Sequence, residues 1–177
     1  MTPDLIGVLE ALDRHGVRCV VIGGLAANLL GSPILTNDVD VCYARDDANL
    51  ERLAAALTAL DASLRGAPPG LAFTPDAATL RAGDRFTFTT RLGPLDVLGQ
   101  PDGSGGYEAL RRTARRFTVR GVQVLVCSLD DLITMKRAAG RVKDRLMVEE
   151  LAALREERDR LAAEGHDPDA GLPDRPS

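Results

Sequence analysis

The sequence is poor in aromatic residues and in histidine, and each shortage excludes a class of site. Aromatics make up 3% of the 177 residues and tryptophan is absent, so the core must be aliphatic. No aromatic platform on which nucleic-acid bases could stack is visible. The only histidines are His15, at the end of an expected helix, and His166, in the C-terminal tail, which argues against a histidine-based metal or catalytic site.

Cysteine is also scarce, and its placement argues against a disulfide framework or a zinc site. Cys19, Cys42 and Cys127 are odd in number, and no pair of them has metal-ligand spacing. Two of the three lie inside apolar runs, as buried free thiols do. The N-terminus lacks the pattern of a secretory signal, and no apolar run is long enough to span a membrane. We therefore expect a cytoplasmic protein with no membrane partner.

Lysine is the rarest of the charged residues, and its position is informative. The chain has twenty arginines but only two lysines, Lys136 and Lys143, which both fall in the run MKRAAGRVKD. Where composition so favours arginine, two lysines indicate positions that need a compact ammonium group, such as a phosphate site. The net charge of −4 excludes a protein that binds nucleic acid through its overall charge.

The hydrophobic pattern predicts an α/β (α+β) chain whose mixed or antiparallel sheet is flanked by helices. We expect one domain over residues 1–164 and a disordered tail over 165–177, because the tail is polar and rich in proline. Ser128 is expected to cap a helix, and a long charged helix should run from about 143 to 164. The sequence predicts strands at 18–22, 38–43 and 115–128, and antiparallel strands within 71–98 at LAFTP, ATLRA, RFTFTTRL and PLDVL.

The segment TNDVDV, residues 36–41, puts two carboxylates on one face of an apolar strand. Alternate side chains of a strand share a face, so Asp38 and Asp40 project together while Val39 and Val41 face the core. Like charges on one face repel, and burial raises the cost of each. A divalent cation offsets that cost directly, because carboxylate oxygens are preferred ligands of Mg²⁺. The alternative is an edge strand whose polar face is exposed to water.

Two further features strengthen the case for a phosphate and metal site. Gly23 and Gly24 end one strand and open a helix, and glycines there let a phosphate approach the backbone closely. Asp96 lies in the apolar segment LGPLDVL and would add a third carboxylate if its strand lay beside DVDV. The alternatives are a tight turn for the glycine pair and an exposed strand position for the acid.

The run GGLAANLLGSPILTNDVDV, residues 23–41, resembles the signature of the nucleotidyltransferase superfamily with the DNA-polymerase-β-like fold. That signature is a glycine turn, a short helix, and then T-x-D-hydrophobic-D. The segment SLDDLITMKRAAGRVKDRLMVEEL, residues 128–151, is similar to the C-terminal helices of small bacterial members, including abortive-infection toxin-like nucleotidyltransferases. The resemblance implies the nucleotidyltransferase fold with C-terminal helices and, for toxin-like members, a toxin–antitoxin setting.

The resemblance also implies a reaction, the transfer of a nucleoside monophosphate from a nucleoside triphosphate to an acceptor hydroxyl. Asp38 and Asp40 would hold the Mg²⁺ or Mn²⁺ that accompanies the triphosphate. Asp96 would complete a second metal position and take the proton of the attacking hydroxyl. The nucleotide would be held by the glycine turn, the loop threonine and nearby basic residues, namely Gly23, Gly24, Thr36, Lys136, Arg141 and Lys143.

The acceptor stays open between an RNA or tRNA end and a small molecule. Residues 111–120 hold five arginines, and Arg111, Arg112, Arg115 and Arg116 could bind RNA phosphates. An exposed helix and strand in an arginine-rich protein explain the same run equally well. Relatives also use aminoglycosides or lincosamides as acceptors. Because the chain has little room for an acceptor domain, we expect an oligomer or a partner protein to complete the site.

A competing hypothesis is a catalytically inactive binding module of the same fold that acts through a protein or RNA partner. Many relatives carry serine where this chain has Gly24, and a basic residue where it has Ile34. Three clustered carboxylates argue against this alternative, because a binding module has no reason to hold repelling acids together. Stabilisation by a divalent metal with nucleotide would discriminate between the two.

Overall fold

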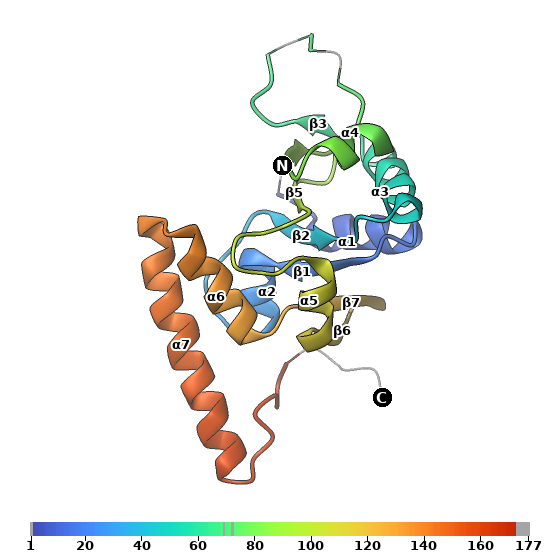
Figure 1. The fold of residues 1–177 in the computed structure, drawn as a ribbon. Coiled ribbons are helices and arrows are strands. Elements are labelled where there is room, and N and C mark those ends of the chain that lie inside the picture. Colours follow the sequence, from blue (N-terminus) through green and yellow to red (C-terminus); the bar gives the residue numbers. More distant parts are fainter. Residues whose placement is uncertain (1, 69, 72, 173–177) are drawn as a thin grey trace.

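The computed structural model describes residues 2–68, 70–71 and 73–172, with the side chain of Lys143 left out. Its described strands form one mixed sheet of seven strands in the order β3-β4-β5-β2-β1-β7-β6 (Figure 1). The strands are β1 Cys19–Ile22, β2 Val39–Tyr43, β3 Ser63–Leu64, β4 Arg85–Thr89, β5 Pro94–Leu98, β6 Arg115–Val119 and β7 Val122–Val126.

The helices cover this sheet in two groups. Figure 1 shows α6 and α7 packed together on one side of the molecule and α1, α3 and α4 gathered on the other. Among the described residues, no helix is both long enough and apolar enough to cross a membrane. The helices are α1 Leu5–Arg14, α2 Gly23–Leu29, α3 Asp47–Ala59, α4 Ala77–Ala82, α5 Tyr107–Thr113, α6 Leu129–Ala139 and α7 Val142–Ala163.

Strand β2 lies in the middle of the sheet. It pairs with β1 in the antiparallel sense and with β5 in the parallel sense, so that Asp40 faces Ile22 on one side and Asp96 on the other. Val39 and Val41 are completely buried, as the alternation of the sequence predicts. The alternative of an edge strand with a wet polar face is therefore wrong, since β2 has a hydrogen-bonded neighbour on both sides.

The predicted strands between 71 and 98 are partly wrong. RFTFT and PLDVL do form the antiparallel pair β4–β5, but ATLRA lies in helix α4. The Asp76 side chain accepts a hydrogen bond from the Thr79 N–H at 2.7 Å, and this N-cap opens a helix that buries Leu80. The expected strand LAFTP includes Ala72, which lies outside the described residues, and its described part is not a strand.

The C-terminal helices follow the sequence-based expectation closely. Ser128 caps α6, because its hydroxyl accepts a hydrogen bond from the Asp131 N–H at 3.1 Å. Helix α7 begins at Val142 and ends at Ala163, within about one residue of the predicted ends. These two helices place Lys136 and Asp144 beside the strands that carry the acidic residues.

The segment after α7 folds back toward β6 as far as residue 172. Asp169 is 8% exposed and forms ion pairs with Arg115, at 2.9 Å, and with Arg158 of α7. Leu172 packs against the core. Residues 173–177 lie outside the described residues, and the domain boundary near 164 and the disorder of the tail stay predictions.

The three cysteines are free thiols, as predicted from their number and spacing. Cys42 and Cys127 are buried and Cys19 is half-buried. Burial raises the pKa of Cys19 and of Cys42 to about 12, so neither is a thiolate at neutral pH. Their role in the structure is to fill the core.

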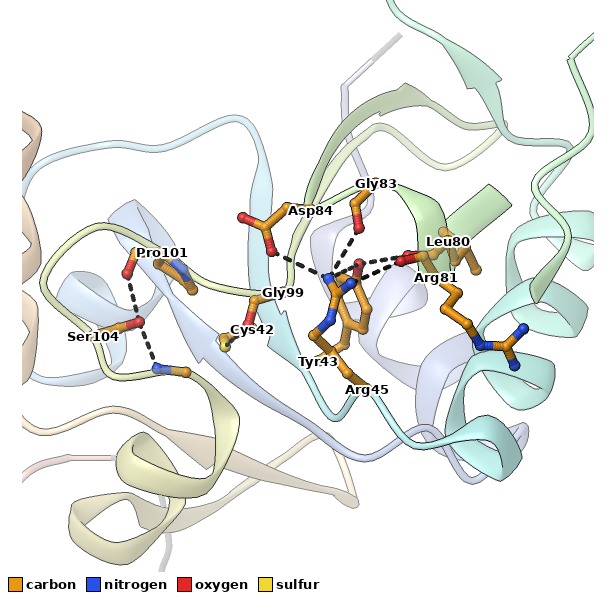
Figure 2. Close-up of polar contacts among 11 residues, drawn as sticks. Cys42, Tyr43, Arg45, Leu80, Arg81, Gly83, Asp84, Gly99, Pro101 and Ser104 are labelled. Atoms are coloured by element: carbon orange, nitrogen blue, oxygen red, sulfur yellow. Dashed lines mark hydrogen bonds and ion pairs between the residues drawn. The ribbon is translucent and has the colours of Figure 1, made fainter. Parts of the chain in front are cut away.

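A network around Arg45 fixes the connection between α4 and β4 (Figure 2). The Arg45 guanidinium donates to the carbonyl oxygens of Arg81, at 2.9 Å, and Gly83, at 3.0 Å. It also contacts the Asp84 carboxylate at 3.2 Å and the Tyr43 hydroxyl at 3.3 Å. A cation at the C-terminal end of a helix satisfies carbonyls that have no partner within the helix.

The loop after β5 is held by its own hydrogen bonds, also visible in Figure 2. The Ser104 hydroxyl donates to the Pro101 carbonyl at 2.6 Å and accepts from the Gly106 N–H at 3.0 Å. The Gly99 N–H donates to the Asp84 carbonyl at 2.7 Å. This loop is therefore anchored at both ends, with Pro101 and Asp102 held at the mouth of the cleft described below.

We expect Arg45→Ala to lower the free energy of unfolding by about 1–2 kcal/mol, because two carbonyls and one carboxylate lose a charged donor. Chemical denaturation would measure the change. The matched control is Arg112→Ala. Arg112 is an exposed arginine on α5 that makes no hydrogen bond or ion pair with any described residue, so its loss should shift stability by less than about 0.5 kcal/mol. Equal effects of the two substitutions would contradict the assigned role of Arg45.

Candidate active site

A cleft of about 560 Å³ opens beside β1, β2 and β5, against the side of α6 and the start of α7. The three predicted carboxylates all line it, although Asp96 comes from a segment of the chain far from the one that holds Asp38 and Asp40. So do all the other predicted site residues whose side chains are described; the side chain of Lys143 lies outside the described residues. The predicted residues in the cleft are Asp38, Asp40, Asp96, Gly23, Gly24, Thr36, Lys136 and Arg141.

Gly23 lets the Asp40 carboxylate lie directly against the backbone. A Cβ atom at Gly23 would stand 2.1 Å from Asp40 Oδ2, far inside van der Waals contact. Gly23 also has φ +66°, a conformation that side chains disfavour. The sequence predicts that this glycine lets a phosphate approach the backbone. The structure shows that it also lets the Asp40 carboxylate do so.

Gly24 makes room for the Thr36 hydroxyl. A Cβ atom at Gly24 would stand 2.6 Å from Thr36 Oγ1. That hydroxyl donates to Asp38 Oδ1 at 2.7 Å, so Thr36 orients the first carboxylate. The serine that many relatives carry at this position would compete for the space that the Thr36 side chain occupies here.

Asp96 is bound by an arginine that the sequence did not point to. Arg65, just after β3, donates to Asp96 Oδ1 at 2.7 Å and to the Phe88 carbonyl at 3.0 Å. Arg85 on β4 also lines the cleft and forms an ion pair with Asp102 at 3.6 Å. The alternation of RFTFTT could have placed Arg85 on the same face as Thr87, but only the β4–β5 register brings them beside Asp96.

Lys136 reaches the cleft from α6 and is held there by Asp144 of α7. The two side chains form an ion pair at 3.2 Å, with Lys136 21% exposed and Asp144 6% exposed. The pair fixes the ammonium group on the wall opposite the carboxylates, where it favours the charged form of Asp40.

Two acidic residues of the cleft, Asp40 and Asp96, have raised pKa values. Burial, together with the charges of Asp38 and Asp96, raises the pKa of Asp40 to about 7, against smaller opposing effects of Lys136 and Arg65. Burial also raises the pKa of Asp96, and the neighbouring Arg65 opposes that shift. Such shifts identify groups that repel each other and lack solvent, as residues of functional sites often do.

The donor set fits Mg²⁺ or Mn²⁺, both of which prefer carboxylate oxygens. Asp40 and Asp96 face each other across β2–β5, and the charges of Asp38 and Asp96 both act on Asp40. Within the described residues, however, no three acidic, histidine or cysteine side chains already stand in a geometry that could hold a metal ion. The reason is visible in their partners: Asp96 is turned to Arg65, and Asp38 to Thr36.

The arginines expected to bind RNA lie elsewhere. Arg115 and Arg116 belong to β6, the edge strand farthest from β3, and Arg111 and Arg112 belong to α5, which contacts β1; none of the four lines the cleft. Arg111 is paired with Glu108 at 2.7 Å and Arg115 with Asp169. All four are exposed on a helix and a strand, which is the arrangement that the sequence allowed as the alternative.

Solved structures share this architecture at low sequence identity. The chain has the nucleotidyltransferase fold. A Thermotoga maritima protein assigned as a nucleotidyltransferase matches with a TM-score of 0.53 and 16% identity, over 84% of this chain and 90% of that one. The lincomycin-bound lincosamide antibiotic adenylyltransferase LnuA matches with a TM-score of 0.55 and 11% identity, over 84% and 94%.

ANT(2″)-Ia in complex with adenylyl-2″-tobramycin matches with a TM-score of 0.50 and 14% identity, over 88% of this chain and 89% of that one. No protein-family model matches the sequence, and no curated protein matches it. At these identities the likeness establishes the fold, and the fold predicted from the glycine turn and the paired aspartates is confirmed. The activity of this chain has to be argued from its own cleft.

We expect Asp40→Asn to stabilise the metal-free protein at neutral and higher pH. The pKa of Asp40 is raised from 3.8 to about 7, so the folded state loses stability as pH rises from about 4 to about 7 and the carboxyl ionises. The difference in unfolding free energy between wild type and variant should therefore change across this window, by on the order of 2–4 kcal/mol.

Denaturation with a chelator present at pH 4.5 and pH 8 would measure that difference. Asp159→Asn, an exposed position on α7, controls for the loss of one negative charge elsewhere. If the Asp40→Asn difference were the same at both pH values, the charge repulsion assigned to this cleft would be wrong.

A side chain at Gly23 should destabilise the protein in two ways, through its backbone conformation and through a collision with Asp40. Gly121→Ala introduces a side chain at φ +83° with no atom within 4 Å, so it measures the backbone cost alone, about 1 kcal/mol. Gly23→Ala at φ +66° adds the collision with Asp40, and we expect it to cost about 3 kcal/mol. It should also weaken Mn²⁺ binding. Equal stability losses, with Mn²⁺ affinity unchanged, would show that Asp40 does not depend on this glycine.

Proposed function

We propose that this protein is a metal-dependent nucleotidyltransferase that moves a nucleoside monophosphate from a nucleoside triphosphate to an acceptor hydroxyl. The observation that carries the proposal is the meeting of Asp38, Asp40 and Asp96 in one cleft, opposite Lys136. These are the residues that such a transfer needs for metal and phosphate binding, and they lie in a chain with the nucleotidyltransferase fold.

The carboxylates divide into two tasks in this proposal. Bound Mg²⁺ or Mn²⁺ would be held by Asp38, Asp40 and Asp96 in two positions, and would neutralise charge on the phosphate oxygens. Asp96 also accepts the proton of the attacking hydroxyl, a role that its raised pKa supports. For this, its carboxylate exchanges Arg65 for the substrate hydroxyl.

The opposite wall binds the triphosphate. Lys136 donates to the phosphates from a position fixed by Asp144, and Arg141, at the N-cap of α7, adds a second cation. Gly23 and Gly24 leave room for the Asp40 carboxylate and the Thr36 hydroxyl, and the phosphates would approach this turn next to those two side chains. The acceptor oxygen then forms a bond to the α-phosphorus, the bond to pyrophosphate breaks, and pyrophosphate leaves with its charge balanced by these cations.

A small-molecule acceptor is favoured over an RNA end. The cleft is of the size that holds small ligands, and the four arginines expected to bind RNA lie outside it. The similarly folded proteins include a lincosamide adenylyltransferase and one bound to adenylyl-2″-tobramycin, an adenylylated small molecule. A cytoplasmic location, where nucleoside triphosphates are available, belongs to this proposal.

The activity can be tested by label transfer. The protein would be incubated with each α-labelled nucleoside triphosphate and Mg²⁺, alone, with total cellular RNA, and with pooled small hydroxylated compounds. We expect pyrophosphate release and labelled product with the small compounds. Asp38→Asn/Asp40→Asn should reduce both by at least about 100-fold, because the metal loses its ligands, while the exposed Asp159→Asn should change neither.

Thermal unfolding with Mn²⁺ and nucleotide gives a readout that needs no acceptor. Wild type should gain stability, and the double variant should not. Label on RNA alone would refute the small-molecule acceptor. Absence of product in every reaction, with no stabilisation by metal and nucleotide, would contradict the enzyme and support the inactive binding module.

A further inference from the structure

The side of the cleft beyond Asp96 is basic, and nothing in the proposed phosphate chemistry uses it. Its charged side chains are Arg65, Arg85 and Asp102, and Thr87 adds a hydroxyl. We propose that the acceptor carries a phosphate group beside its reacting hydroxyl, and that Arg85 and Arg65 bind that phosphate. This inference rests on the proposed function and specifies the class of acceptor.

The sheet order separates the two substrates. From β1 to β3 the neighbouring strands are β1, β2, β5, β4 and β3. The residues proposed to bind the triphosphate lie near β1, at the start of α2 and on α6; they are Gly23, Gly24 and Lys136. Asp96 on β5 marks where the attacking hydroxyl must arrive. An acceptor that delivers its hydroxyl there, without displacing the triphosphate, extends over β4 and β3.

The register places Arg85 and Thr87 directly on that path. Thr87 faces Asp96 across the β4–β5 pair, and Arg85 faces Leu98, two residues further along the same face. Arg65 reaches the same place from the end of β3 and donates to Asp96 at 2.7 Å. All three side chains line the one cleft, so a phosphate bound by the arginines would hold its own hydroxyl within reach of Asp96.

The arginines have donors to spare for a ligand. Arg85 is 45% exposed, and its ion pair with Asp102 is 3.6 Å long, longer than a hydrogen bond. Arg65 is 38% exposed, and its side-chain hydrogen bonds to Asp96 and to the Phe88 carbonyl both come from one nitrogen, Nη2. The carboxylates beside these two guanidinium groups are Asp102 and Asp96, and the metal proposed to bind Asp96 would offset the charge of that carboxylate. The two guanidinium groups then suit a dianionic phosphate, which they can bind through paired N–H donors.

The same charges disfavour the two other acceptor classes. An acceptor with several ammonium groups would meet two guanidinium groups in the space next to Asp96, and these like charges would repel each other. An RNA chain would need a basic track leading out of the cleft, whereas none of the four arginines on α5 and the edge strand β6 lines it; these are Arg111, Arg112, Arg115 and Arg116.

Calorimetry with three compact hydroxyl compounds tests the inference: glycerol phosphate, glycerol and diaminopropanol, which are anionic, neutral and dicationic. Each would be titrated into protein saturated with Mg²⁺ and a non-hydrolysable triphosphate analogue. We expect glycerol phosphate to bind at least about ten-fold more tightly than glycerol, and diaminopropanol least tightly. Arg85→Gln should abolish most of that preference while leaving the affinity for the analogue within about two-fold.

Arg81→Gln is the matched control, because Arg81 is an exposed arginine of α4 that pairs with Asp47 and does not line the cleft. It should leave the order of the three probes unchanged. Equal binding of the probes, tighter binding of diaminopropanol, or an order that survives Arg85→Gln would overturn the inference.

Tighter binding of a short RNA that depends on Arg112 and not on Arg85 would overturn it too. If the analogue itself failed to bind with Mg²⁺, the proposed function would fall, and the acceptor inference with it. If the analogue bound and the probes did not discriminate, only the acceptor inference would fall.

Discussion

Mutual repulsion among three carboxylates is the constraint on which the architecture of this cleft depends. Asp40 lies in β2, Asp38 directly before it, and Asp96 in the neighbouring β5; burial first, and then the charges of Asp38 and Asp96, raise the pKa of Asp40 to about 7. A protein gains nothing by such an arrangement unless a ligand removes the repulsion. The surrounding residues fit this view, since each relieves part of the strain: Thr36 donates to Asp38, Arg65 donates to Asp96, and Lys136 faces Asp40.

The fold creates this situation by sheet topology rather than by sequence proximity. Because β2 lies between β1 and β5, it brings Asp40 beside Asp96, more than fifty positions later in the chain, and against the backbone of Gly23. The pair α6–α7 then closes the far wall with Lys136 and Asp144. The sheet holds the acids and two helices hold the cation, on the two sides of the cleft in which we propose that the triphosphate binds.

Much of the fold and of the site could be predicted from local pattern. The alternation in TNDVDV and the glycine pair before it identified Asp38, Asp40 and Gly23, because strand periodicity fixes which side chains share a face. The strand pattern gave a wrong prediction at one segment, where a helix cap decided the structure instead. The segment ATLRA alternates like a strand, but the Asp76 side chain caps it as a helix.

Arg65 and Arg85 were missed for a different reason. Their relation to Asp96 depends on the register of β4 with β5 and on the end of the two-residue strand β3, and neither is written in any local run of sequence. Conversely, the arginine-rich run at 111–120 stood out in composition, yet the topology places it at the opposite edge of the sheet. Composition shows which charged residues are present, whereas the pairing of the strands decides which of their side chains lie close together.

The central claim is that the three carboxylates form a binding site for a divalent metal. The most direct test is calorimetric titration of Mn²⁺ into the protein in the presence of a non-hydrolysable triphosphate analogue, with Asp38→Asn, Asp96→Asn and the exposed Asp159→Asn beside wild type. We predict that wild type and Asp159→Asn bind two Mn²⁺ ions per chain, that Asp96→Asn binds fewer, and that Asp38→Asn shows no tight binding. Mn²⁺ binding that is absent in wild type, or that is the same in all four proteins, would contradict it.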